Sequence, residues 1–143
     1  MTSVTGTIFY STGYKYQLRT PYHHFTVIRP PEPIVTDLIS LGVDGRLDIL
    51  SGYAWDGPSG PAIHSKDFLR GSLVHDALYQ LLRGGYLDAK WREEADKLLR
   101  AICIEDKMLH FRAQYVYEAV RACAMSAADS SIEHPIEQAP VDI

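Results

Sequence analysis

The sequence has few cysteines: only Cys103 and Cys123 occur among its 143 residues. Small domains that depend on disulfides carry more of them, so we expect a hydrophobic core to stabilise this fold by itself. Both cysteines lie in segments with helical periodicity. One bridge between the two helices stays open as an alternative, but the pattern favours free buried thiols and a reducing compartment.

Long apolar runs and basic runs are also missing. No apolar stretch approaches the ~20 residues of a membrane-spanning helix. The first ten residues lack the basic and apolar regions of a signal peptide. With 14 Lys and Arg against 18 Asp and Glu, the formal net charge is −4, which disfavours binding to nucleic-acid phosphates. We therefore expect no transmembrane segment and no nucleic-acid partner.

What the sequence does contain is typical of one globular domain. Hydrophobic residues make up 46% and charged residues 22% of the chain, both close to the average for globular proteins. We predict a single α+β domain over residues 1–128. The polar, proline-containing residues 129–143 are predicted to form a disordered tail.

The first half of the chain has the character of short strands. β-Branched and aromatic residues alternate with Gly and Pro, and an Asp-Gly pair at positions 44–45 indicates a tight turn. Pro30, Pro31 and Pro33 exclude a central strand at that point. The predicted strands span residues 5–10, 14–18, 24–28, 34–39 and 47–50.

From Ser65 onward the hydrophobic period becomes helical. Ser65 or Asp67 can cap a first helix that ends near Arg83, where two glycines follow. Asp88 can cap a second helix, which is predicted over residues 89–105. The periodicity predicts a third helix over residues 107–128. We therefore expect a short antiparallel, β-rich N-terminal half packed against three C-terminal helices.

A His-Asp pair interrupts the first predicted helix, in the string Val-His-Asp-Ala-Leu-Tyr at positions 74–79. His75 shares a helix face with Tyr79, and Asp76 lies about 100° round the helix at the edge of its polar sector. If the first two helices pack antiparallel, Asp96 of the second can meet His75. A carboxylate on one imidazole nitrogen fixes the tautomer and leaves the other nitrogen free to accept a proton.

A loop with two glycines and two prolines, Trp-Asp-Gly-Pro-Ser-Gly-Pro at positions 55–61, precedes the first helix. Such a backbone turn exposes carbonyl oxygens that can bind a hard cation, with Asp76 as the charged ligand that calcium favours. The loop can also place an amide for oxyanion stabilisation. The simpler interpretation is a strand-to-helix connection.

The loop, the string Leu-Val-His-Asp-Ala-Leu-Tyr and the string Arg-Glu-Glu-Ala-Asp at positions 92–96 form a three-part pattern. This pattern resembles an uncharacterised phage and bacterial family, domain-of-unknown-function family 1353. The resemblance covers roughly residues 45–100 and brings no established activity. It implies a phage protein that resides in the cytoplasm of the host cell or in the virion.

The same layout of glycine-rich loop, His-Asp-x-x-Tyr helix and later helical Asp also resembles phospholipase A2, especially its compact viral form. The resemblance implies that His75 is the base that activates water, that Asp96 orients it, and that Tyr79 braces the site. It further implies a calcium ion bound by Asp76. The resemblance also implies that backbone carbonyl oxygens of the loop complete the calcium site, at Trp55, Gly57 and Gly60.

Three functions follow as hypotheses. The first is a calcium-dependent hydrolase of a lipid or other ester. The second is a noncatalytic phage protein, either a virion component such as a tail protein or a protein that interferes with host defence through a host partner. There the His-Asp-Tyr cluster would be structural, and Asp96 could be a surface carboxylate paired with Arg92 or Arg100. The third, ranked last, is a His-Asp metal phosphohydrolase with His64 and His110 as further ligands.

Overall fold

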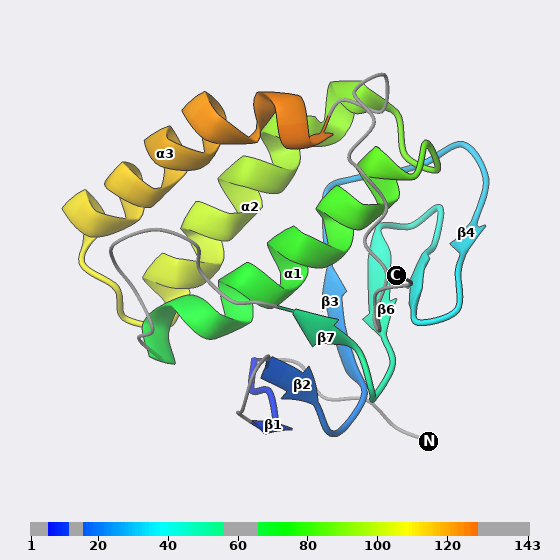
Figure 1. The fold of residues 1–143 in the computed structure, drawn as a ribbon, viewed down its shortest axis with the longest axis horizontal. Coiled ribbons are helices and arrows are strands. Elements are labelled where there is room, and N and C mark those ends of the chain that lie inside the picture. Colours follow the sequence, from blue (N-terminus) through cyan, green and yellow to red (C-terminus); the bar gives the residue numbers. More distant parts are fainter. Residues whose placement is uncertain (1–5, 12–15, 56–65, 129–143) are drawn as a thin grey trace, which may run out of the picture.

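The computed structural model describes residues 6–11, 16–55 and 66–128, and these form an α+β fold (Figure 1). The described strands form two antiparallel sheets, a three-stranded one in the order β1-β2-β7 and a four-stranded one in the order β3-β6-β5-β4. Their bounds are β1 Tyr10–Ser11, β2 Tyr16–Leu18, β3 Tyr22–Phe25, β4 Ile34–Val35, β5 Ile39–Leu41, β6 Arg46–Ile49 and β7 Ala54–Trp55.

The predicted Asp-Gly turn is confirmed as the connection between β5 and β6. Gly45 has a φ of 89°, which favours glycine, and the Gly42 amide donates to the Arg46 carbonyl at 2.9 Å. The strand predicted over residues 34–39 is wrong as one element. Its chain reverses at Thr36, whose hydroxyl donates to the Ile39 carbonyl at 2.8 Å, so β4 and β5 form a hairpin.

Other strand boundaries also differ from the prediction. β3 begins at Tyr22 and ends at Phe25, and just beyond it the Thr26 amide and hydroxyl both donate to the Gly45 carbonyl, at 2.8 and 2.9 Å. Of the described part of the first predicted strand, over residues 5–10, only Tyr10 belongs to an observed strand, which is β1 at Tyr10–Ser11. The pattern gave no prediction of β7, which has two residues and pairs with β2.

The three helices occur close to where periodicity predicts them: α1 is Lys66–Arg83, α2 is Arg92–Glu105 and α3 is His110–Ala128. A 3₁₀ turn, Ala89–Trp91, precedes α2, and the Asp88 carboxylate caps it by accepting from the Lys90 amide at 2.8 Å. α3 begins three residues later than predicted, because Lys107 adopts a left-handed φ of 77°. Within the described residues, none of the helices combines the length and apolar character needed to cross a membrane.

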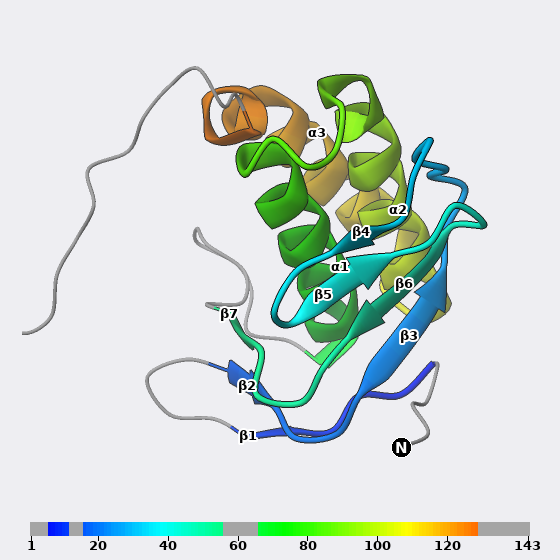
Figure 2. The same cartoon turned by 90° about the vertical axis from the view of Figure 1, so that its right-hand side faces the viewer.

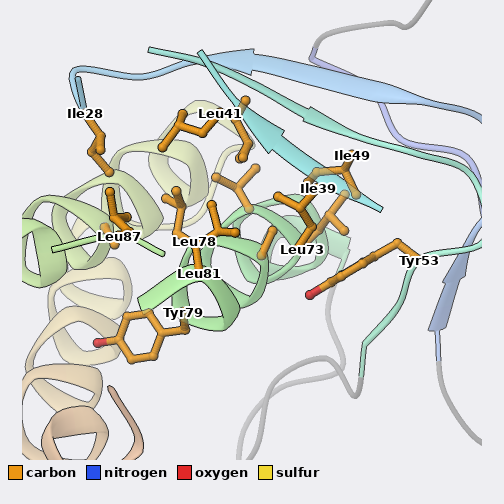
Figure 3. Packing of buried hydrophobic residues seen from close by; sticks show 14 of the residues in the cluster. Ile28, Ile39, Leu41, Ile49, Tyr53, Leu73, Leu78, Tyr79, Leu81 and Leu87 are labelled. Carbon is orange, nitrogen blue, oxygen red and sulfur yellow. The ribbon is translucent and has the colours of Figure 1, made fainter. Parts of the chain in front are cut away.

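The helices form one layer and the four-stranded sheet a second layer (Figure 2). α1 lies against the sheet, and α2 lies between α1 and α3 (Figure 1). Leu73, Leu78 and Leu81 of α1 lie on the side of the helix that is directed toward the sheet, with Leu73 beside Ile39 and Ile49, whereas Tyr79 points away from the sheet (Figure 3). The α1 helix is thus packed on one side against the sheet and on another against α2, so His75 and Asp76 lie on a rigid support.

Cys103 is a free thiol, as the sequence predicts, and it is fully buried between α1 and α2. Burial raises the pKa of this thiol to about 12. In a Cys123→Ser variant, we expect no labelling of the folded protein by a disulfide reagent at pH 8 and full labelling once guanidinium unfolds it. Rapid labelling of the folded variant would contradict the burial of Cys103.

Candidate functional site

The centre of the site is a contact between α1 and α2, which form a helical hairpin (Figure 1). His75 Nε2 lies 2.7 Å from Asp96 Oδ1. This is the contact that antiparallel packing of the two helices predicts. His75 is on the face of α1 that is directed toward α2, where the Cys103 side chain and Leu99 approach Gly71 closely.

Asp96 is completely buried and accepts hydrogen bonds from three side chains. Tyr79 donates its hydroxyl to Oδ1 at 2.6 Å, the oxygen that also faces His75, and Arg121 of α3 donates Nη1 to Oδ2 at 2.8 Å. Burial acts to raise the pKa of Asp96, but these donors outweigh it and hold the pKa below its ordinary value. The carboxylate is therefore ionised at neutral pH.

The alternative of a surface carboxylate paired with Arg92 or Arg100 is wrong for Asp96. Its ion-pair partner is Arg121, and its exposed fraction is 0%. Arg100 instead donates to Gln114 at 2.9 Å and lies over the ring of Tyr117.

One nitrogen of the His75 ring has a hydrogen-bond partner, and the other has none among the described residues. Because an ionised carboxylate only accepts hydrogen bonds, the proton between His75 and Asp96 belongs to Nε2. No side chain in the described part of the chain bonds to Nδ1. Tyr79 packs on the ring with centroids 4.1 Å apart, and the His75 side chain is 14% exposed. The imidazole is therefore held in one orientation with Nδ1 able to accept a proton.

Asp76 lies on a different side of α1 and contacts the segment that leads into β7. The Tyr53 hydroxyl donates to Asp76 Oδ2, and Gln80 Nε2 donates to the Tyr53 oxygen at 2.9 Å. Burial and the neighbouring Asp76 carboxylate raise the pKa of Tyr53, so its phenol stays protonated. A hollow of about 300 Å³ lies beside Tyr53 and Gln80. His75 thus faces α2, whereas Asp76 faces the segment that leads into β7.

Trp55 is a core residue that ties the end of β7 to α1. Its indole Nε1 donates to the Ser72 hydroxyl at 2.9 Å, and Ser72 donates onward to the Leu69 carbonyl at 2.8 Å. Ser72 is therefore buried rather than part of a solvated sector. Gly57 and Gly60, the other predicted loop ligands, lie outside the described residues.

A metal site is not complete within the described residues. No group of three or more His, Cys, Asp or Glu side chains there is arranged so that it could hold a metal ion. Asp76 is the carboxylate at this place, and its Oδ2 atom accepts the hydrogen bond from Tyr53. Calcium takes about six to eight oxygen ligands, so the remaining donors would have to come from other parts of the chain or from water.

A second polar cluster, which the sequence pattern did not reveal, surrounds Arg70 of α1. Its guanidinium is 3% exposed and donates to Asp106 at 2.8 Å, to Glu105 at 2.7 Å and to the Tyr22 hydroxyl at 2.9 Å. His24 Nδ1 lies 3.0 Å from the same hydroxyl, and burial first, then Arg70, lowers the pKa of His24. His23 and His24 are neighbouring, half-buried residues of β3. Because each of the three guanidinium nitrogens of Arg70 has a hydrogen-bond partner, this cluster ties β3, α1 and the end of α2 together.

The sequence pattern did not reveal two partners of the predicted residues: Arg121, which binds Asp96, and Tyr53, which binds Asp76. Arg121 is 25 positions after Asp96, and Tyr53 is 23 positions before Asp76. Neither has a local spacing that would reveal the contact. Comparisons with family models, with curated proteins and with solved structures found no match.

Proposed function

We propose that the protein is a hydrolase of esters, with lipid esters as its substrate class and His75 as the general base. The observation that supports this most directly is the bond from His75 Nε2 to the buried, ionised Asp96, which leaves Nδ1 with a lone pair. Tyr79 fixes the same carboxylate oxygen and packs on the ring, which limits the orientations of the imidazole. This is the arrangement of a base with its orienting partner.

In the proposed reaction, Nδ1 of His75 takes a proton from water while the water oxygen bonds to the ester carbonyl carbon. The carbon–oxygen bond to the alcohol then breaks, and the alkoxide takes the proton from Nδ1. Asp96 stabilises the imidazolium that exists between the two proton transfers. The products are a carboxylic acid and an alcohol, and the base returns to its starting state.

Calcium is part of the proposal as the group that would polarise the ester carbonyl. Asp76 would supply the carboxylate, and the carbonyl oxygens of Trp55, Gly57 and Gly60 would supply further ligands. Tyr53 would have to release Asp76 Oδ2 for that carboxylate to bind the ion through both oxygens. The resemblance to phospholipase A2 supports this assignment, and the calcium site remains a prediction.

A noncatalytic role is the second candidate, since one observation favours it. Asp96 joins all three helices through His75 and Tyr79 of α1 and Arg121 of α3, which is also what a structural cluster would do. In that case the protein would be a virion component or would bind a host protein, and His75 could be replaced without loss of function.

The deciding experiment measures fatty-acid release from mixed phosphatidylcholine and phosphatidylglycerol vesicles, in calcium or in EDTA. We expect release by the wild-type protein and a loss of at least ~100-fold in His75→Gln, because a general base contributes about that much or more. His110→Gln is the matched control, since His110 is exposed at the start of α3. Equal rates for wild type and His75→Gln would favour the noncatalytic role.

A further inference from the structure

Arg121 is the residue of α3 that reaches into the His75 site. Its Nη1 atom donates to Asp96 Oδ2 at 2.8 Å, and its own side chain is 29% exposed. The other carboxylate oxygen, Oδ1, is occupied by His75 and Tyr79. Arg121 therefore contacts Asp96 on the side opposite to the proposed base, and does not touch His75 through any described hydrogen bond.

The charge of Asp96 needs compensation because the carboxylate has no contact with solvent. From α1, Tyr79 is a neutral donor, since burial and then its bond to Asp96 raise its pKa. His75 is neutral when it holds a single proton on Nε2. On α2, the Arg92 guanidinium influences Tyr79 rather than binding Asp96.

The acidic and phenolic groups near Arg121 cannot supply the positive charge that compensates Asp96. Glu93 of α2 is 53% exposed, and Tyr117 of α3 donates to it at 3.5 Å. Both also act on Arg121 in the direction that keeps it protonated. Within the described residues, Arg121 is thus the cation that neutralises Asp96 by a direct bond.

We propose that Arg121 is a positioning residue that keeps Asp96 ionised and thereby keeps the single proton of His75 on Nε2, with Nδ1 free to accept. This inference rests on the proposed function of His75 as a base. It assigns to α3 a part in the site that neither the helix pattern nor the resemblance assigns.

Loss of the Arg121 charge removes the cation that compensates the buried Asp96 carboxylate. Asp96 then takes up a proton and donates it to Nε2, which moves the ring proton to Nδ1. The nitrogen that should accept the proton of water is then already occupied.

The test follows the ring nitrogens of His75 by NMR in protein labelled with ¹⁵N-histidine, at pH 7 and without substrate. The His75→Gln spectrum assigns the signals. In the wild type we expect Nδ1 in the unprotonated range and Nε2 in the protonated range. In Arg121→Met we expect Nδ1 to shift into the protonated range, and in Arg121→Lys to return toward the wild-type position.

The matched control is Arg100→Met, which removes another arginine between α2 and α3 without touching Asp96. We expect its His75 signals to be unchanged. A protonated Nδ1 in the wild type, or an unprotonated Nδ1 in folded Arg121→Met, would overturn the proposal. If Arg121→Met does not fold, the wild-type spectrum and Arg121→Lys still decide, because a lysine that leaves Nδ1 protonated would contradict a role for the charge.

The spectra separate this inference from the proposed function, since they need no turnover. The expected spectra without any ester hydrolysis would support the positioning role and reject the hydrolase. If hydrolysis occurs, kcat of Arg121→Met should fall about 10-fold or more with little change in KM, because Arg121 acts through the base. Hydrolysis with unaltered spectra in Arg121→Met would reject the positioning role alone.

Discussion

Replacing Asp96 with Asn is expected to lower the free energy of unfolding by about 3 kcal/mol and to abolish most of any hydrolysis. The asparagine amide group has the shape of the carboxylate but lacks its charge. One of its two terminal groups is now a donor, so it must face either Arg121 or the pair of donors on Oδ1. At least one buried hydrogen bond is therefore lost, and the tautomer of His75 is no longer fixed.

The pH dependence of stability gives a second signature of Asp96. Its pKa is lower in the folded protein than the ordinary value of 3.8, so the unfolded chain binds its proton more readily. The stabilisation by the ionised carboxylate is complete above the unfolded pKa and is lost as the pH falls through the folded value. Chemical denaturation should give a constant difference between wild type and Asp96→Asn above about pH 5 and a shrinking difference below it.

Asp106→Asn is the matched control for Asp96→Asn. Asp106 also binds a buried arginine of α1, Arg70, but it lies at the end of α2 and contacts no residue of the His75 site. We expect this control to lose stability and to retain hydrolysis. Equal losses of hydrolysis in both variants would mean that Asp96 acts only through the stability of the fold.

The helical half of the fold could be predicted because its signals are local. Asp88 lies just before an apolar period of 3.6 residues, and the glycines after Arg83 end α1, so both boundaries follow from neighbouring residues. The contact of His75 with Asp96 was also within reach, since a short connection between two amphipathic helices restricts them to antiparallel packing. Side-chain spacing then determines which residues face one another.

The remaining features depend on contacts between distant segments. Thr36 reverses the chain through its own side chain, and the apolar alternation of residues 34–39 hides that reversal. β7 is too short to produce a pattern and exists because β2 is beside it. Arg121 could not be placed, because its orientation depends on how α3 rotates against α2. Local residues predicted the contact of His75 with Asp96, while tertiary packing determines the charge balance around these two residues.

Replacing Gly71 with Leu is expected to lower the free energy of unfolding by about 3 kcal/mol, near the upper end of the usual cost of overpacking. Gly71 is four residues before His75, at a place where Leu99 and Cys103 of α2 lie close to the backbone of α1. A Cβ atom there would lie 3.0 Å from Leu99 Cδ1, 3.1 Å from Cys103 Sγ and 3.3 Å from the Leu99 carbonyl oxygen. A leucine side chain must therefore displace α2 itself.

The same displacement should separate Asp96 from His75, because Asp96 is on the segment of α2 that has to move. A shift of α2 away from α1 would break the 2.7 Å contact between these two side chains. We expect Gly71→Leu to lose hydrolysis along with stability, measured by fatty-acid release and guanidinium denaturation on the same sample. Gly71→Ala is the control: Leu99 and Cys103 can yield a few tenths of an ångström, and alanine gains about 1 kcal/mol in helix propensity. Wild-type stability in Gly71→Leu would show that this close approach of the helices does not determine the geometry of the His75 site.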